Sequence, residues 1–228
     1  MTNSGRNMSP SWISLLNGYS NPVLRQAVNS AYATSTVYPA RENLFRAFSF
    51  FDPSQTRVVI LGQDPYPQPG NACGLCFAVP HTQPTPGSLL HIFAEIDREF
   101  GPSPHDSELT SWASQGVLLL NTILSVHEGA PMSHAAFGWQ SFTDHIIRRL
   151  SETNKHMVFL LWGSPAAAKA SLVDTSRHLV LCSTHPSGLS WGKRNDGTRT
   201  RPDAFWGCNH FAQCNDYLAA HNIPPIRW

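Results

Sequence analysis

Four short runs of apolar residues constrain the fold of this chain more than any other feature. Each run is continuous rather than alternating, and Val, Leu and Ile dominate it. Continuous runs of this length are typical of strands buried on both faces of a parallel sheet. The runs are Arg57–Leu61, Val117–Leu120, Met157–Trp162 and His178–Cys182.

Segments with helical spacing separate these runs. Apolar residues recur every three or four positions in Gly87–Phe100 and Phe137–Leu150, and a shorter pattern covers Pro165–Val173. A last helix is expected over Asn209–Ala220. Alternating strands and helices predict right-handed crossovers and a three-layer α/β/α fold with a central four-stranded parallel sheet. The whole chain, 1–228, fits one such domain.

The N-terminal segment shows no clear targeting signal. Residues 1–11 are expected to be flexible, and the apolar spacing from Trp12 to Tyr19 predicts a helix after them. The segment before Glu42 is poor in acidic residues, as transit peptides are, but it carries only three arginines. No secretory signal is visible, and no run approaches the ~20 apolar residues of a membrane span. We expect a protein that is not secreted and has no membrane partner, cytoplasmic if bacterial and nuclear if viral or eukaryotic.

The five cysteines, an odd number in a chain of this size, favour a reducing compartment over a disulfide framework. Cys73 and Cys76 form a C-x-x-C pair, and Cys208 and Cys214 flank His210 further along. Metal or iron–sulfur ligation is one interpretation of these pairs. Both pairs lie among Phe, Leu and Ala, however. We interpret them as small core residues and expect no metal and no cofactor.

Polar and turn-forming residues follow each of the four expected strands. Ligands of open parallel sheets bind outside the carboxyl ends of the strands. The carboxylate of Asp64, the amide of Asn121 and the imidazole of His185 would therefore meet at one edge of the sheet. This arrangement predicts an active site without naming its substrate. The segments after the strands are Gly62–Tyr66, Asn121–Thr122, Gly163–Pro165 and Ser183–Gly188.

Five motifs occur in order along the chain: GQDPYP, LLLNTIL, LLWGS, THPSGLS and GCNHF. Their order and spacing resemble those of the main, uracil-specific family of uracil-DNA glycosylases, from about Trp12 to near the C-terminus. The resemblance implies hydrolysis of the N-glycosidic bond between uracil and deoxyribose, with the base flipped out of the helix, as the first step of base excision repair. It also implies a monomer without a metal that acts on uracil-containing DNA, single- or double-stranded, and a DNA-mimicking inhibitor protein as a further candidate partner.

The resemblance assigns the two catalytic roles. Cleavage of the bond to uracil N1 builds positive charge on the sugar and negative charge on the base. Asp64 matches the family's carboxylate, which orients water and stabilises the cationic sugar. His185 matches the imidazole that donates to uracil O2. A neutral His185 could donate in this way if a backbone partner fixed its tautomer.

The resemblance also places Gln63, Tyr66, Phe77 and Asn121 against the base. The amide of Asn121 can satisfy both the N3 donor and the O4 acceptor of uracil, whereas cytosine presents the reverse pattern. Thymine differs from uracil by one methyl group, which an open apolar pocket would hardly reject. Tyr66, held between two prolines, matches the wall that excludes it. Phe77 matches the ring that stacks on the base.

Short Ser, Pro and Gly turns match the family's loops that grip backbone phosphates. Such turns direct N–H groups and hydroxyls at anions, and the helices expected to begin at Ser88 and Ser164 would add their positive ends. Ser187 is the DNA-contacting residue expected in the third turn. Leu189 matches the apolar wedge that enters the helix where the base has left.

The chain departs from the family pattern at Pro67 and Cys73, where histidine is usual, and at Gly188, where proline is usual. The formal net charge is only +1 at pH 7, so any surface for DNA must be local. The segment 190–204 is longer than the family's connection and net positive. It is either a solvated polar surface insertion or an added arm for the DNA backbone. Its basic residues are Lys193, Arg194, Arg199 and Arg201.

Three other interpretations compete with this one. A mismatch-directed glycosylase of the same superfamily tends to lack both the carboxylate and the tyrosine wall, which Asp64 and Tyr66 supply here. An iron–sulfur glycosylase would need four suitably placed cysteines. The alternative from a different class is a non-catalytic DNA-binding or replication-accessory module on the same fold. Loss of Asp64 or His185 would indicate such a module, and the chain has both.

Overall fold

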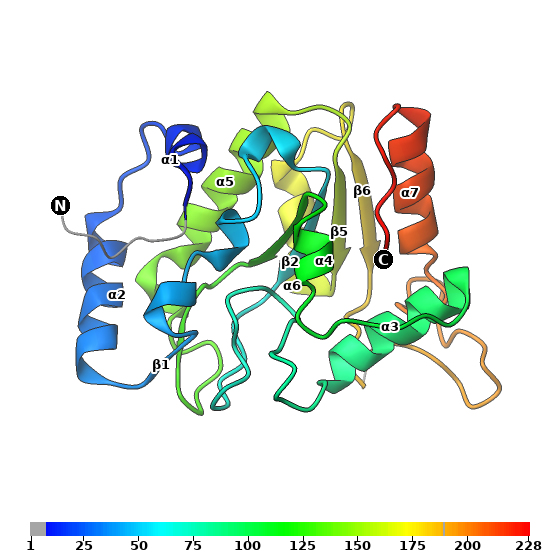
Figure 1. The fold of residues 1–228 in the computed structure, drawn as a ribbon, viewed down its shortest axis with the longest axis horizontal. Helices are drawn as coiled ribbons and strands as arrows, with labels where there is room; N and C mark the ends of the chain where they lie inside the picture. The colour runs from blue at the N-terminus through cyan, green and yellow to red at the C-terminus, as the bar shows by residue number, and fades with distance from the viewer. Residues whose placement is uncertain (1–7, 189) are drawn as a thin grey trace.

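The computed structural model describes residues 8–188 and 190–228. A four-stranded sheet lies at its centre, with helices on both faces, which confirms the expected α/β class (Figure 1). Each strand lies within one residue of its predicted run. The strands are β2 (Val58–Gly62), β3 (Val117–Asn121), β5 (Val158–Trp162) and β6 (Leu179–Ser183).

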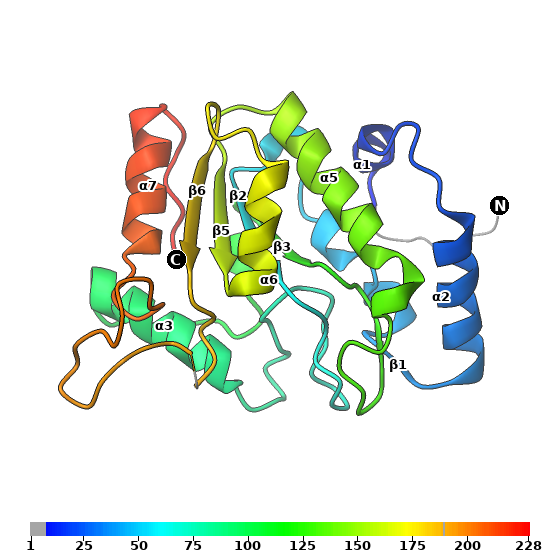
Figure 2. The ribbon, with the colours of Figure 1, turned by 180° about the vertical axis from the view of Figure 1, so that it is seen from behind.

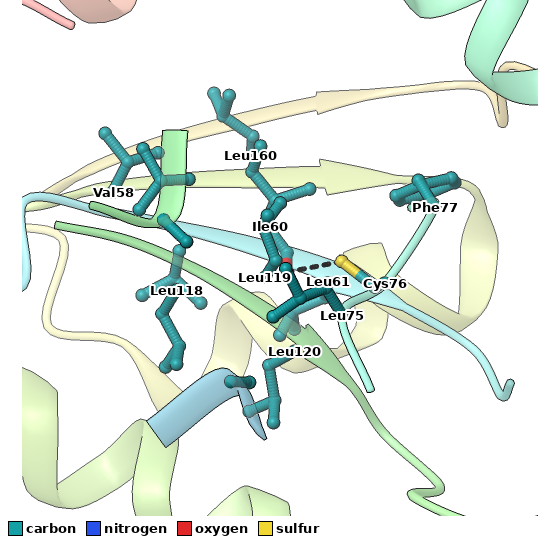
Figure 3. Packing of buried hydrophobic residues seen from close by; sticks show 14 of the residues in the cluster. Val58, Ile60, Leu61, Leu75, Cys76, Phe77, Leu118, Leu119, Leu120 and Leu160 are labelled. Carbon is teal, nitrogen blue, oxygen red and sulfur yellow. Dashed lines mark hydrogen bonds between the residues drawn. The ribbon is translucent and has the colours of Figure 1, made fainter. Parts of the chain in front are cut away.

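The sheet is parallel throughout and has the order β3-β2-β5-β6. The register pairs Val58 with Val117 and runs to Gly62 opposite Asn121. Because β2, β3 and β5 are covered on both faces, their apolar runs are almost wholly buried (Figure 3). β6 differs from the expectation, since its residues Leu179–Cys182 remain at least partly exposed, whereas β3 at the opposite edge is buried.

The helices form the two outer layers of the fold. α3 (Gly87–Phe100), α4 (Thr110–Ala113) and α7 (His210–Ala220) lie on one side of the sheet, and α5 (Trp139–Thr153) and α6 (Ser164–Ala167) lie on the other (Figures 1 and 2). α3 matches its predicted range in full. The helix predicted over Pro165–Val173 divides into α6 and the 3-10 helix Ala168–Leu172.

The N-terminal part packs beside this core. α1 (Pro10–Leu15) begins inside the segment expected to be flexible and ends before Tyr19. Trp12 is fully buried and donates its indole N–H to the carbonyl of Phe51 at 2.7 Å. None of the described helices has the length and apolar character needed to cross a membrane. The remaining elements are α2 (Pro22–Thr34), the antiparallel pair β1 (Val37–Tyr38) and β4 (Val126–His127), and the 3-10 helices Arg41–Asn43, Arg46–Phe48, Pro53–Gln55 and Ala135–Phe137.

Two buried carboxylates of α3 hold the start of α7. Glu95 accepts hydrogen bonds from the backbone N–H groups of Gly207 and Asn209, at 2.7 and 3.1 Å, and two more from Arg98. Glu99 accepts from the N–H of Ala212. Asn209 is the N-cap of α7 and Ala212 lies in its first turn, so two of these bonds satisfy backbone donors that the helix start leaves unpaired, and they fix α7 to α3.

The two cysteine pairs occupy separate places in the core. The thiol of Cys76 lies under β2 and donates to the carbonyl of Ile60 at 3.4 Å (Figure 3). Cys208 lies instead beside Glu95 and Glu99, the one group of three potential metal ligands within 8–188 and 190–228. Four hydrogen bonds already fill the lone pairs of Glu95, so this group is explained by the docking of α7.

Candidate active site

A cavity of about 840 Å³ lies outside the carboxyl ends of the strands. The strand order reverses between β2 and β5, and the segments after these two strands form part of its wall. Such a reversal point is where open α/β sheets bind their ligands. Every catalytic and base-binding residue expected from the sequence lines this one cavity. These residues are Gln63, Asp64, Tyr66, Phe77, Asn121 and His185.

Asp64 stands on the turn that follows β2, where one backbone N–H and one side-chain amide orient its carboxylate. One oxygen, Oδ2, accepts from the N–H of Met132 at 2.7 Å, and Oδ1 accepts from the side-chain amide of Gln63 at 3.2 Å. The turn itself is anchored by the N–H of Gly129, which donates to the carbonyl of Pro67 at 2.8 Å. The carboxylate therefore has a fixed orientation in the cavity wall.

A buried polar cluster supports the loop that carries Met132. The hydroxyl of Ser125 accepts from the indole N–H of Trp139 at 2.8 Å and bonds Nδ1 of His134 at 2.8 Å. Burial lowers the pKa of His134 to about 4, so its ring is neutral at physiological pH. The sequence did not predict the hydrogen bond from the Met132 N–H to Asp64. Every residue except proline has a backbone N–H, so no residue type marks such a donor.

His185 follows β6, and one backbone group sets the state of its ring. The N–H of Ser187 donates to Nδ1 of His185 at 3.0 Å, so Nδ1 is unprotonated. Burial lowers the pKa of His185, which favours the neutral ring with its proton on Nε2. This contact and this burial agree with the expected neutral imidazole whose tautomer is fixed by the backbone.

Asn121 is the last residue of β3 and lies across Gly62 of β2. A Cβ built on Gly62 would fall 2.2 Å from Oδ1 of Asn121 and 2.7 Å from Cβ of Cys76. Only glycine at position 62 leaves room for the amide. Glycine is therefore required as the first residue of the GQDPYP motif, because it leaves space for the side chain of Asn121.

Tyr66 and Phe77 form the aromatic part of the wall and are joined to each other. The Tyr66 hydroxyl donates to the carbonyl of Phe77 at 3.1 Å, and burial raises the pKa of Tyr66. Phe77 has a positive φ of 63°, a conformation that bulky residues rarely adopt. Its ring lies 5.7 Å from that of Trp162 and 5.8 Å from that of His185, beyond the carboxyl end of the sheet (Figure 3).

The expected phosphate-gripping turns lie around the same cavity. Ser88, Ser164 and Ser187 all line it, although they come from three separate segments. Ser88 belongs to the first turn of α3 and Ser164 opens α6. Leu189, the expected wedge, lies outside the described residues.

The segment 190–204 is folded into a hairpin at the cavity rim. Lys193 pairs with Arg199 in an antiparallel bridge, and the Lys193 ammonium lies 4.0 Å from the centre of the Trp206 ring. Lys193 and Arg201 line the cavity, and Arg201 also pairs with Asp203. Arg199 turns inward and donates to the carbonyl of Ala204. Arg194 is exposed and is not part of the lining.

Comparisons with known proteins agree with this site. Residues 48–219 match the family described as the uracil DNA glycosylase superfamily. The chain is 48% identical to a uracil-DNA glycosylase of Campylobacter concisus over 87% of this chain and 82% of that one, and 45% identical to one of Idiomarina loihiensis over 90% and 91%. The crystal structure of mimivirus uracil-DNA glycosylase superposes with a TM-score of 0.88 at 28% identity, covering 97% of this chain and 87% of that one. A variant of the mimivirus enzyme has been solved in complex with UGI, with a TM-score of 0.87.

Proposed function

Since this chain belongs to the uracil DNA glycosylase superfamily and excises uracil from DNA as a repair glycosylase, we propose that Asp64 and His185 are its catalytic residues. As the bond between C1′ and N1 of uracil breaks, its electrons move to the base and the sugar becomes cationic. Asp64 stabilises that cation and directs water to C1′. His185 donates from Nε2 to uracil O2, where the negative charge develops. The products are free uracil and an abasic sugar.

Four further residues of the cavity recognise the base. Asn121 pairs with N3–H and O4 of uracil, and cytosine would leave these buried groups unpaired. Tyr66 occupies the space next to C5, where the methyl of thymine would lie, and its bond to the Phe77 carbonyl keeps it there. Phe77 stacks on the base. Gln63 donates to Oδ1 of Asp64 and contacts the base from the same turn.

The serine turns around the cavity grip the DNA backbone, on single or double strands. Ser88, Ser164 and Ser187 line the cavity from three separate segments and supply hydroxyl and N–H donors. Leu189 enters the helix behind the flipped base. Since a mimivirus relative binds UGI, an inhibitor protein that mimics DNA is expected to cover the same rim. The protein works as a monomer, in the cytoplasm of a bacterium like the bacterial relatives named above.

The convergence of Asp64, Asn121 and His185 on one cavity carries this proposal. The test is a strand-incision assay on uracil-containing DNA followed by alkali, with Asp64→Asn as the key variant. We expect a loss of about 10²–10³-fold in kcat. Asp216→Asn, on the exposed face of α7, is the matched control and keeps full activity. Wild-type protein that binds DNA but releases no uracil would point to the non-catalytic accessory module.

The hairpin at the rim is proposed as an added arm for the DNA backbone. Lys193 reaches the cavity and Arg194 does not, so these two residues make a matched pair. Each phosphate contact contributes about 0.9 to the slope of log affinity against log salt. Lys193→Gln should lower that slope by about one, and Arg194→Gln should leave it unchanged. An unchanged slope in Lys193→Gln would contradict the DNA-contacting arm and favour the interpretation of 190–204 as a solvated surface insertion.

A further inference from the structure

The turn after His185 is held together by its own backbone. The N–H of Ser187 bonds Nδ1 of His185, while the carbonyl of Ser187 accepts from the N–H groups of Ser190 and Trp191, at 2.8 and 2.9 Å. The orientation of the catalytic imidazole therefore depends on where this turn sits. Bonds inside the turn fix its shape, but they do not fix its position against the rest of the protein.

One side chain of α3 contacts the turn at both of its ends. Nδ1 of His91 lies 2.6 Å from the carbonyl oxygen of Pro186, and it is the donor because a carbonyl only accepts. The ring of His91 also stacks on that of Trp191, with centroids 3.8 Å apart and planes 7° from parallel. His91 thus contacts both Pro186 and Trp191.

Trp191, the second residue that His91 contacts, is itself anchored. Trp191 packs against Trp206 at 5.3 Å, and its carbonyl accepts from the Trp206 N–H at 2.7 Å. The next residue after Trp206, Gly207, is bonded to Glu95 of α3. α3 therefore holds the turn directly through His91 and indirectly through the hairpin, as one connected unit.

Gly188 makes these two contacts of His91 more important. It is exposed, and a Cβ built there would meet only Cε1 of His91, at 3.9 Å. A glycine at this point leaves the backbone free to move unless a neighbour restrains it. We propose that His91 is a positioning residue for uracil excision: its bond to the Pro186 carbonyl keeps the Ser187 N–H on Nδ1 of His185. The inference rests on the proposed role of His185.

The test is a double-mutant cycle between positions 91 and 185, measured as kcat on single-stranded uracil-containing DNA, where no base stack is invaded. His91→Phe keeps a planar ring against Trp191 but cannot donate to Pro186. We expect it to lower kcat about five- to tenfold with little change in KM, the size of one lost hydrogen bond. In a His185→Ala background the same change should lower the residual kcat by less than about twofold.

A matched control comes from a second histidine near α3. His105 stacks on Phe93 at 4.3 Å and bonds Asp97 at 2.9 Å, outside the cavity lining. His105→Phe should leave kcat unchanged. His91→Leu, which also removes the donor, replaces His91→Phe if that variant does not fold.

Two results would overturn the inference. One is an equal loss from His91→Phe in both backgrounds, and the other is no loss in the wild-type background. Full kcat in His185→Ala alone would instead reject the proposed catalytic role of His185, and the inference with it.

Discussion

Gly62→Ala gives the sharpest test of how the base is recognised. The new Cβ would lie 2.2 Å from Oδ1 of Asn121 and 2.7 Å from Cβ of Cys76, whereas ordinary contacts begin at 3.4 Å. Cys76 is 1% exposed and packed under β2, so it has little room to move. The amide of Asn121 faces the cavity and must give way by about 1 Å.

A displacement of this size would remove both hydrogen bonds proposed between the amide and uracil. Errors of about 1 Å in a reacting geometry cost on the order of 10²-fold in rate. We therefore expect kcat/KM for uracil excision to fall about 100-fold, while overpacking lowers the free energy of unfolding by about 1–3 kcal/mol. Excision kinetics and urea unfolding measure the two effects separately.

Two further variants isolate the cause. Gly87→Ala adds a Cβ with no heavy atom within 4 Å, and it should change neither quantity. In an Asn121→Ala background, Gly62→Ala should cost no further activity, because the displaced group is already gone. A Gly62→Ala chain with kcat/KM within about twofold of wild type would refute the positioning of Asn121 argued from this contact.

Two other predictions follow from buried and exposed groups near α3. Burial raises the pKa of Glu99 from 4.5 to about 7, so between these values the folded chain binds a proton that the unfolded chain lacks, and stability falls as pH rises through that window. The melting temperature should be lower at pH 8 than at pH 6, and Glu99→Gln should remove most of this difference. Gly188→Pro fits the open space at that residue and should raise activity on duplex DNA more than on single strands; equal effects would contradict it.

The strands and the convergence of the main candidate-site groups could be predicted because each has a local signature. Continuous Val, Leu and Ile runs marked the sheet, and the positions of Asp64, Asn121 and His185 after three strands placed them at one edge. The pair of β1 and β4 has only two residues per strand, too few to form a pattern. Its position is set by packing rather than by local sequence.

The supporting contacts of the site could not be predicted in this way. Asp64 is oriented by the N–H of Met132 and His185 by that of Ser187, and neither donor depends on its side chain. The hairpin at 190–204 has the charge of a solvated loop. Its order comes from Trp191 and Trp206, whose contact only the folded chain brings about.

The central place of β2 in the sheet has a consequence for synthesis. β2 is the earliest of the four strands in the chain, yet partners made later flank it on both sides. When synthesis has just passed Asn121, the nascent polypeptide already contains Asp64 and Asn121. More than sixty residues must still be added before it contains His185. With the role proposed for His185, enzyme activity is a late event of translation, acquired only when β6 and the turn behind it have left the ribosome and docked.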